Sequence, residues 1–469
     1  MDATAPLTAH APGAGVPAEV AAAPGARTPL VLPRDGGSPG RRPADDGDRR
    51  PGGARPSVVL DHAAFDDLAD AWDHLWARSP SATPFQTHAW TSAWARAYVP
   101  TGQLAVVMVW DGDRLAAAAA LHRVRRGPVR LLAPLGGEIS DHTDVLLDPR
   151  VPDAGPRLVQ ALLQVPGWRV LDLPEVLQGA AAQQWARDWP GRVRRAPASV
   201  DLELPALPVA DVLARVPART AGTLRRKIRR IERLGVERTE VAPADVPRAV
   251  TDLIRLHEAQ WAGRRGNPEH LTARFRRHLV EALPPMIERG QAVVVEYRLD
   301  GELVAGEVDL IGHAQLSYYL AGISPALREH IDTAVLLVSS ALERATRLGK
   351  AEYSFLRGLE DYKLRWRPDE VTATRLLLAR PGPLGSAGYF TAAAVSRSAL
   401  ALARRALRGP ARELARTVMQ GVRMLRTRSQ APAGPSDAGQ LQRDAVEDVV
   451  LADHDVVQGE GVHEHPQHQ

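Results

Sequence analysis

The sequence predicts an α/β fold made of two similar domains in tandem, each with a mixed, largely antiparallel sheet flanked by helices. Two observations carry this prediction. A pattern of three strands joined by tight turns occurs twice, at 102–136 and at 290–322. A segment with helical periodicity precedes the strands in both places, at 87–97 and at 273–288. Such repetition indicates two copies of one supersecondary unit.

The turns and the segment after the second copy define the order of elements. Asp111-Gly112 and Asp300-Gly301 each separate two apolar runs, which is the strongest short signal for a hairpin. After the second copy, Asp332 is placed to cap a helix that Gly349 ends, and a strand follows at 351–356. The predicted order is therefore three antiparallel strands, a helix and a further strand.

The two ends of the chain differ from its centre. Residues 1–56 hold ten prolines, nine glycines and no aromatic residue, which is typical of a disordered tail. An Arg-rich helical extension is predicted at 385–428 and a disordered polar tail at 429–469. The predicted domains between them are 57–200 and 201–384.

The composition excludes several classes of protein. The chain has 469 residues, 45% of them hydrophobic, which is enough for two or three domains. It contains no cysteine, which rules out disulfide scaffolds, thiolate metal sites, iron–sulfur clusters and a cysteine nucleophile. Neither a GxGxxG nor a GxxxxGK[ST] motif is present, so we expect no dinucleotide or P-loop fold, and we expect no metal.

Charge and hydropathy bear on partners and location. Arginine supplies all but three of the 59 basic residues, an excess that mostly indicates a GC-rich genome. The absence of a long apolar run and of a secretory signal predicts a cytoplasmic protein. Residues 388–428 are either a solvated appendage or a peripheral contact with the inner membrane face. The run 219–233 is either a linking helix or a contact with CoA phosphates, tRNA or an anionic polymer; it has no aromatic residue, so nucleic-acid binding is not expected.

Two groups of acidic residues are candidates for a general base. Glu307 and Asp309 lie two residues apart on a predicted strand and therefore face one side, either as catalytic groups or as part of a solvated sheet face. Asp141, His142 and Asp144 follow a strand and a Gly-Gly pair. A carboxylate beside an imidazole makes a plausible base, and the alternative is a turn with Asx-type hydrogen bonds.

Further candidates lie in the second predicted domain. Lys363 is one of only three lysines, and its neighbours Glu360 and Tyr362 follow a glycine; the lysine either neutralises developing charge or pairs with Glu360. Tyr319 is either a proton donor to a leaving thiolate or an aromatic residue of the sheet. His257 and Trp261 share a helix face and either line an acceptor pocket or pack in the core.

Five short motifs lie in order between residues 58 and 380. They are 85–90 with Trp94, 135–144, the basic stretch 224–235, Leu256-His257 with Trp261, and the string RGLEDYKLRW at 357–366. Together they resemble the CelD-like (cellulose biosynthesis protein-like) family of GNAT acetyltransferases. The resemblance implies a duplicated GNAT fold related to Fem-type aminoacyltransferases.

The resemblance also implies a reaction. An acyl group, acetyl in particular, is expected to pass from acyl-CoA as co-substrate to an amine of an amino sugar or of a cell-envelope or exopolysaccharide precursor, by direct attack. Such an enzyme needs oxyanion donors from a splayed strand, a base, and an anion site for the pyrophosphate. The anion site is expected at the helix beginning near Thr333, assisted by Arg328 and His330, although Asp332 competes for the same amides. We expect the second domain to bind the acyl donor.

Two alternatives stay open. A Fem-type peptidoglycan transferase would take its acyl group from aminoacyl-tRNA. A non-catalytic scaffold of a polysaccharide biosynthesis complex is the other alternative. It is suggested by two departures from the family pattern, at 330–334 and at Ser354, where the family usually has Ser-Pro-Gly and Asp.

Overall fold

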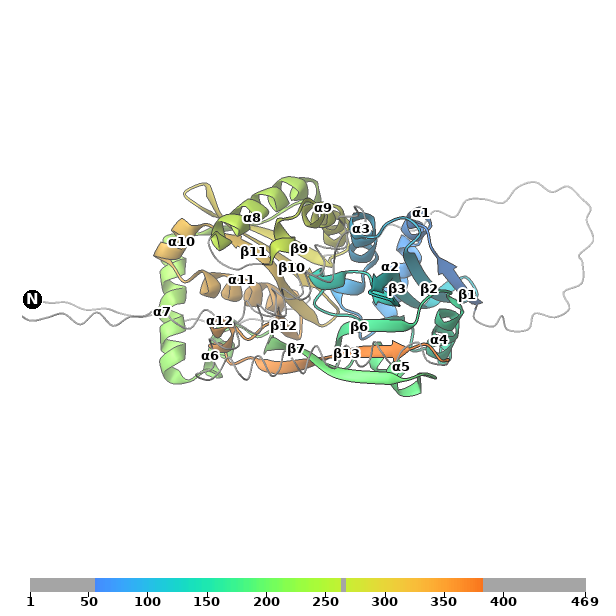
Figure 1. Cartoon of the computed structure of the whole chain (residues 1–469). Coiled ribbons are helices and arrows are strands. Elements are labelled where there is room, and N and C mark those ends of the chain that lie inside the picture. The colour runs from blue at the N-terminus through green and yellow to red at the C-terminus, as the bar shows by residue number, and fades with distance from the viewer. Residues whose placement is uncertain (1–54, 263–266, 383–469) are drawn as a thin grey trace, which may run out of the picture. The chain divides into compact units, whose positions relative to one another are not determined.

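Thirteen strands form one mixed sheet in the part of the chain that the computed structural model describes, residues 55–262 and 267–382 (Figure 1). In sheet order, the first six are β1 (Arg55–Val59), β2 (Leu104–Asp111), β3 (Arg114–Arg126), β4 (Val129–Pro134), β6 (Val170–Leu177) and β13 (Asp369–Ala379). The next six are β7 (Val193–Pro205), β12 (Glu352–Arg357), β11 (Gln315–Ile323), β10 (Glu302–Ile311), β9 (Ala292–Leu299) and β8 (Glu237–Glu240). The short β5 (Leu146–Leu147) pairs with β3.

The sheet consists of two halves with the same internal order. Counted inward from either edge, the fourth and fifth strands form a parallel pair. This pair is β4 with β6 in the first half and β11 with β12 in the second. All other pairs of neighbouring strands are antiparallel, including β7 with β13 at the centre. The predicted fold class and both predicted three-stranded units are thus confirmed.

The two halves exchange their last strands. β7 comes from the first half of the chain but pairs with β12 of the second half. β13 ends the described chain but pairs with β6 of the first half. The predicted boundary at residue 200 therefore falls inside β7, and the domain ranges stay a prediction. The tail at 429–469 and the extension at 385–428 lie outside the described residues, as does 1–54 of the N-terminal tail.

Helices cover both faces of the sheet. Those of the first half are α1 (His62–Asp66), α2 (Ala69–Arg78), α3 (His88–Tyr98), α4 (Ala154–Gln164) and α5 (Ala181–Asp188). Those of the second are α6 (Val209–Ala214), α7 (Ala218–Leu234), α8 (Val246–Trp261), α9 (Ala273–Glu288), α10 (Pro325–His330), α11 (Thr333–Arg347) and α12 (Asp361–Leu364). One apolar cluster joins α3 to α8 and α9 across the two halves. The other faces carry separate clusters, under α4 and α5 and under α6, α7 and α11.

Local sequence signals explain where the key helices begin. Thr87 and Thr272 each accept a hydrogen bond from the backbone N–H three residues on, and so cap α3 and α9. The Asp332 carboxylate accepts from the Val335 N–H at 3.2 Å and caps α11. Gly349, with φ of +64°, follows the end of that helix. The capping prediction for Asp332 is confirmed.

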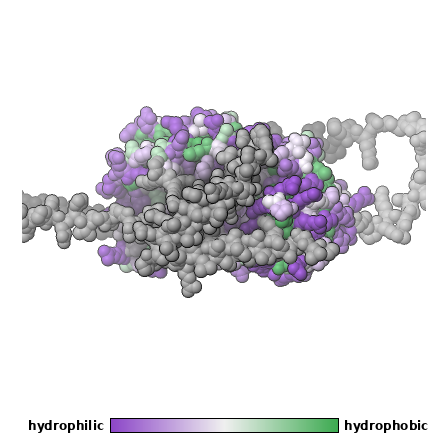
Figure 2. Space-filling model, in the orientation of Figure 1, coloured by the Kyte–Doolittle hydropathy of each residue, from purple (hydrophilic) through white to green (hydrophobic). Residues whose placement is uncertain are grey.

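The visible surface is mostly polar. Hydrophilic residues dominate the part of this face that grey atoms leave in view, and hydrophobic residues occur there in small groups (Figure 2). Among the described residues, no helix combines the length and the apolar character needed to cross a bilayer. The segment 388–428, for which a peripheral membrane contact is one of the two alternatives, lies outside them.

Candidate active site

The parallel strands of the second half pair only briefly before they part. The register joins Gln315–Ser317 of β11 to Glu352–Ser354 of β12 and ends there. β11 then contains a bulge at Tyr319, since Tyr318 and Leu320 pair with adjacent residues of β10. β12 contains a second irregularity at Leu356, whose φ is +57°. Two bulges on facing strands open the sheet at this point.

The first half opens at the equivalent place. β4 and β6 pair only through Leu131–Leu132 and Val170–Leu171. β6 then bulges at Glu175, whose φ is +51°. A residue other than glycine rarely occupies this left-handed region, so its occurrence in both halves marks an equivalent feature of the fold. No motif in the sequence predicts these two bulges.

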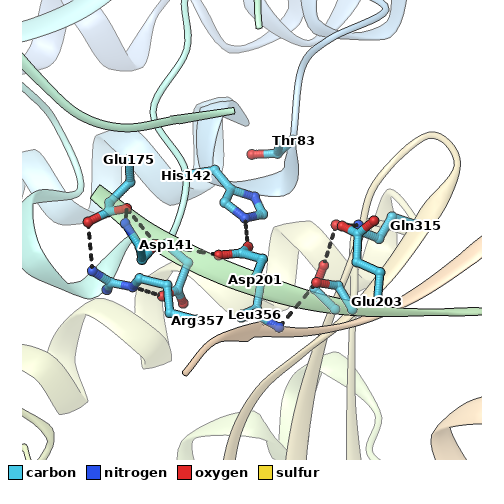
Figure 3. A network of polar contacts seen from close by, with 12 residues as sticks. Thr83, Asp141, His142, Glu175, Asp201, Glu203, Gln315, Leu356 and Arg357 are labelled. Atoms are coloured by element: carbon cyan, nitrogen blue, oxygen red, sulfur yellow. Dashed lines mark hydrogen bonds and ion pairs between the residues drawn. The ribbon is translucent and has the colours of Figure 1, made fainter. Parts of the chain in front are cut away.

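A cluster of charged side chains lies where the two openings meet (Figure 3). Arg357, the last residue of β12, forms an ion pair with Asp141, which follows the short helix η2 (Gly137–Ile139) of the first half. Its Nη1 also lies 3.7 Å from Oε1 of Glu175. Burial opposes the charge of Arg357, but Asp141 and Glu175 outweigh it and raise the pKa of the guanidinium. A permanent cation of the second half therefore binds two carboxylates of the first half.

His142 has a different acidic partner from the ones that the sequence suggested. Its Nε2 lies 2.5 Å from Oδ2 of Asp201 in β7, and both side chains are buried. Its Nδ1 is buried and has no hydrogen-bond partner in the described chain. Asp144 instead accepts bonds from Ser81 and from the first N–H groups of α5, and burial raises the pKa of Asp144 to about 6.

Asp201 was missed because it is 59 positions from His142 in the sequence. One signal was present: Asp201 and Glu203 interrupt an apolar run with the period of a strand, 200–204. Buried acids on one strand face require a partner, so the alternation itself points to a polar site. Ser199 extends the network, since its hydroxyl donates to Glu175 at 2.6 Å.

Two histidines and Tyr319, all from the second half, border the opening between β11 and β12. His257 Nδ1 lies 2.8 Å from the Ala321 carbonyl, and His257 Nε2 lies 3.4 Å from Nδ1 of His270 in η4 (Pro268–Leu271). Burial lowers the pKa of both imidazoles, that of His270 to about 3, so both are neutral at pH 7. Trp261, at the end of α8, is 36% exposed. The ring centroids of His257 and Trp261 lie 6.1 Å apart, as expected for two residues that share a helix face.

Tyr319 connects the two halves. Its hydroxyl donates to the Ile139 carbonyl at 3.0 Å, and its ring packs edge-on against Trp90. Burial raises the pKa of Tyr319, with the negative charge of Asp141 as the next contribution. The phenol therefore stays protonated beside the charged cluster.

The edge of β11 beyond the bulge is already hydrogen-bonded to α8. The Ala321 carbonyl accepts from His257, and the Ile323 N–H donates to Oε1 of Gln260 at 2.9 Å. Gly322 between them allows the close contact, because a Cβ there would lie 2.2 Å from the Leu253 carbonyl oxygen. Side chains, not another strand, thus satisfy this edge.

Lys363 holds the end of β12 in place. Its Nζ donates to the Arg357 carbonyl at 2.6 Å and pairs with Glu360 at 2.7 Å, while its side chain is only 4% exposed. The Tyr362 ring lies 5.9 Å from the ammonium, and burial raises the pKa of the Tyr362 phenol. The predicted pairing of Lys363 with Glu360 is confirmed. Its further contact with Arg357 places it beside the charged cluster.

Glu307 and Asp309 lie elsewhere. They do face one side of β10, as predicted, but that side is covered by α11, and both are fully buried. Arg344 of α11 forms ion pairs with both, and Tyr297 donates to Glu307 at 2.6 Å. Burial raises the pKa of both carboxyl groups. The alternative that the two acids lie on a solvated sheet face is therefore wrong, because both are buried and pair with a cation on the covering helix.

The start of α11 holds the residues expected to bind an anion. Thr333 is the first residue of the helix, and Arg328 and His330 lie on α10 just before it. The Asp332 carboxylate caps the helix and also binds Lys227 and Arg365, with N–O distances of 2.6 and 2.7 Å. The expected competition from Asp332 is thus present. In the described part of the chain, no group of three His, Asp or Glu residues is placed to hold a metal.

Comparison with known proteins identifies the class of the second half. Residues 218–364, from the start of α7 to the end of α12, match the family described as "Acetyltransferase (GNAT) domain". No curated protein sequence matches the chain. The matched residues include the opened pair β11 and β12, so the opening lies in the part of the chain that is similar to a GNAT acetyltransferase domain.

Several solved structures are similar to this chain. The crystal structure of FemX is similar with a TM-score of 0.50 and 10% identity, over 66% of this chain and 95% of that one. The C-terminal domain of a putative lysylphosphatidylglycerol synthetase from Agrobacterium fabrum gives a TM-score of 0.43 and 15% identity, over 68% and 93%. A tandem GNAT protein from the clavulanic acid biosynthesis pathway gives 0.37 and 16%, over 71% and 100%. The likeness to FemX concerns the fold alone.

Proposed function

We propose that the protein transfers an acyl group, acetyl in particular, from acyl-CoA to an amine by direct attack. The observation that carries the proposal is the opened pair β11 and β12 directly beside the Asp141–Arg357 ion pair. The resemblance to CelD-like acetyltransferases suggests the class of acceptor, an amino sugar or a precursor of the cell envelope or an exopolysaccharide. The second half, which matches the GNAT domain, binds the donor.

The chemistry is a single displacement. The amine nitrogen attacks the thioester carbonyl, the C–S bond breaks, the nitrogen loses a proton to a base, and the thiolate gains one. Backbone N–H groups at the bulged strands are suited to stabilise the oxyanion, because fixed donors lose little energy to reorganisation. No covalent enzyme intermediate is needed, which agrees with the lack of cysteine.

Asp141 is the proposed base. Its carboxylate is 14% exposed, so an acceptor can reach it, and Arg357 fixes its direction. His142, the next residue, is anchored to Asp201 and holds the loop. Lys363 acts as a positioning residue through the Arg357 carbonyl. Tyr319 is the proposed proton donor to the thiolate, because burial and the negative charge of Asp141 raise its pKa and keep it protonated.

Three further groups complete the proposal. His257 and Trp261 border the acceptor side, with Glu360 and Tyr362 across β12. Arg328, His330 and Thr333 bind the donor's phosphates. This role requires Lys227 and Arg365 to be shared between Asp332 and the incoming phosphate, because the carboxylate already binds both cations.

The test is acetyl-CoA binding by calorimetry followed by thiol release with a panel of amines. We expect Asp141→Asn to lower kcat about 10²- to 10⁴-fold, the usual contribution of a general base, and to leave acetyl-CoA binding intact. Asp153→Asn is the matched control, since it removes a carboxylate from an exposed ion pair with Arg157.

Other results would contradict the proposal. Failure to bind any acyl-CoA at millimolar concentration excludes the acyl-CoA enzyme. Transfer that depends on added aminoacyl-tRNA supports the Fem-type reaction instead. If the protein binds acetyl-CoA but releases no thiol with any amine, and Asp141→Asn changes neither result, the non-catalytic scaffold is supported instead.

A further inference from the structure

Helix α7 exposes an unusual concentration of positive charge. Its sequence, ARTAGTLRRKIRRIERL, contains seven basic residues and one acid. Only three of its side chains are buried, and it packs on α11 and α6 alone among the major helix contacts. In Figure 1 it runs along the outer edge of the fold. Most of its other residues are exposed.

The arginines of α7 differ from several others in the fold. Arg344, Arg357 and Arg375 each form ion pairs with acids of other elements. On α7, by contrast, only Lys227 has an acidic partner, Asp332. The arginines of α7 make no ion pair within the described residues; they are Arg219, Arg225, Arg226, Arg229, Arg230 and Arg233. Some exposed arginines elsewhere, such as Arg55 and Arg187, also lack an ion pair within the described residues, but on α7 six such guanidinium groups share one helix.

Four of these arginines form a straight row. At 100° per residue, Arg219, Arg226, Arg230 and Arg233 fall within about 60° of one another around the helix, and they span 14 residues, about 21 Å along its axis. All four are exposed. At the N-terminal end of the helix, a shallow depression of about 540 Å³ is lined by Arg215 and Arg367. Arg367 thus extends the basic surface beyond the helix in one direction, while Arg215 forms an ion pair with Asp369 at 3.1 Å.

The surroundings of the row narrow the chemistry of its partner. α7 has no aromatic residue, so it has nothing on which nucleic-acid bases could stack. None of the exposed large hydrophobic residues of the described chain lies on it, so it has no apolar anchor for a bilayer. Guanidinium groups bind carboxylate through paired N–H donors, and basic stretches of this kind occur in sites for nucleic acids and for heparin, an acidic polysaccharide.

We propose that the row formed by Arg219, Arg226, Arg230 and Arg233 binds a linear acidic polysaccharide along α7. The row contacts successive carboxylate or sulfate groups, and the chain continues toward Arg215 and Arg367. This surface is separate from the residues proposed for acyl transfer. Polysaccharide binding is measured without the transfer reaction, so a failure of this proposal can be distinguished from a failure of the proposed function.

The test uses the full chain and a fluorescent heparin oligosaccharide as the probe, with anisotropy as the readout. We expect binding that weakens about 10- to 100-fold between about 50 and about 200 mM salt, as four released counterions require. Replacing all four row arginines by alanine, a strong helix former, should weaken binding at low salt at least tenfold. Replacing them by lysine should keep most of it.

A matched control removes four arginines elsewhere. Arg55, Arg187, Arg195 and Arg276 are exposed and make no ion pair within the described residues, so their alanine variant loses the same charge. Equal loss in both alanine variants would reduce the effect to net charge and overturn the proposal. Stronger binding to a single-stranded oligonucleotide or to phosphatidylglycerol vesicles than to heparin would also overturn it. So would the absence of heparin binding at low salt.

Discussion

The two halves of the sheet share a strand order and an opening but differ in what fills them. In the first half, the chain after β4 enters the opening, and the Thr143 N–H donates to the Glu175 carbonyl at 2.9 Å. In the second, α8 packs against the equivalent edge at Gly322, and its His257 and Gln260 side chains hydrogen-bond to the backbone of β11. The hydrogen bond in the first opening is between backbone groups, whereas those at the second edge come from side chains. This difference favours the second half as the donor site.

The layers between sheet and helix differ as well. On the side of β3 that faces α4, Ala117 and Ala119 belong to an apolar cluster. On the side of β10 that faces α11, the corresponding surface carries Glu307 and Asp309. One copy of the fold thus encloses methyl groups where the other encloses two acids and a cation. The comparison teaches that the same architecture tolerates a buried ionic network only when a covering helix supplies the opposite charge.

The largest expected effect tests this second difference. Arg344→Leu leaves two buried acids without their cation, so we expect the free energy of unfolding in urea to fall by about 3–5 kcal/mol. Replacing Arg344, Glu307 and Asp309 together by Leu, Ala and Ala imitates the first half and should restore most of the loss. A triple variant no more stable than the single one would show that the network itself is required.

The same network shows what could be predicted from the sequence. The Asp-Gly turns, the cap at Asp332 and the doubled strand pattern are local, so their elements were predicted to within a few residues. The exchange of β7 and β13 was not, because no local pattern records which distant strand is paired. The link from Arg344 to Asp309 spans 35 residues and a change of element, so burial of the two acids was equally hidden.

The candidate site divides in the same way. Asp141 was predicted from its neighbours, and its position beside an opening is consistent with that expectation. Its ion-pair partner Arg357 lies 216 residues away. His142 was predicted to act with an adjacent acid, yet its partner Asp201 belongs to another strand. The sequence thus identified one member of each polar pair, Asp141 and His142. The partners were missed because only the fold brings them near.

A middle-sized effect depends on pH and concerns the strand that joins the halves. Burial, with the charge of Glu352, raises the pKa of Glu203 to about 7. Because this pKa is above that of the unfolded chain, the stability it contributes is present below about pH 4.5 and is lost as pH rises through 7. We expect Glu203→Gln to be more stable than the natural protein at pH 8 by about 1–2 kcal/mol.

The measurement is urea unfolding of both proteins from pH 4.5 to 8. Gln keeps an oxygen that accepts the 2.6 Å bond from Gln315, so the variant isolates the charge. The gain should disappear near pH 4.5, where both proteins are neutral at this position. A gain of equal size at every pH would instead mean that packing, not ionisation, separates the two proteins. Asp153→Asn serves as the surface control.

The smallest effect tests whether the two openings act as one site. Tyr319→Phe removes a hydroxyl that donates to Ile139 across the halves, so we expect a loss of about 1 kcal/mol in stability. If Tyr319 also protonates the thiolate, kcat with acetyl-CoA falls while KM for the amine changes little, and a thioester with a more acidic thiol regains part of the rate. A change confined to KM would limit Tyr319 to joining the halves, because a proton donor acts on the leaving group and not on acceptor binding.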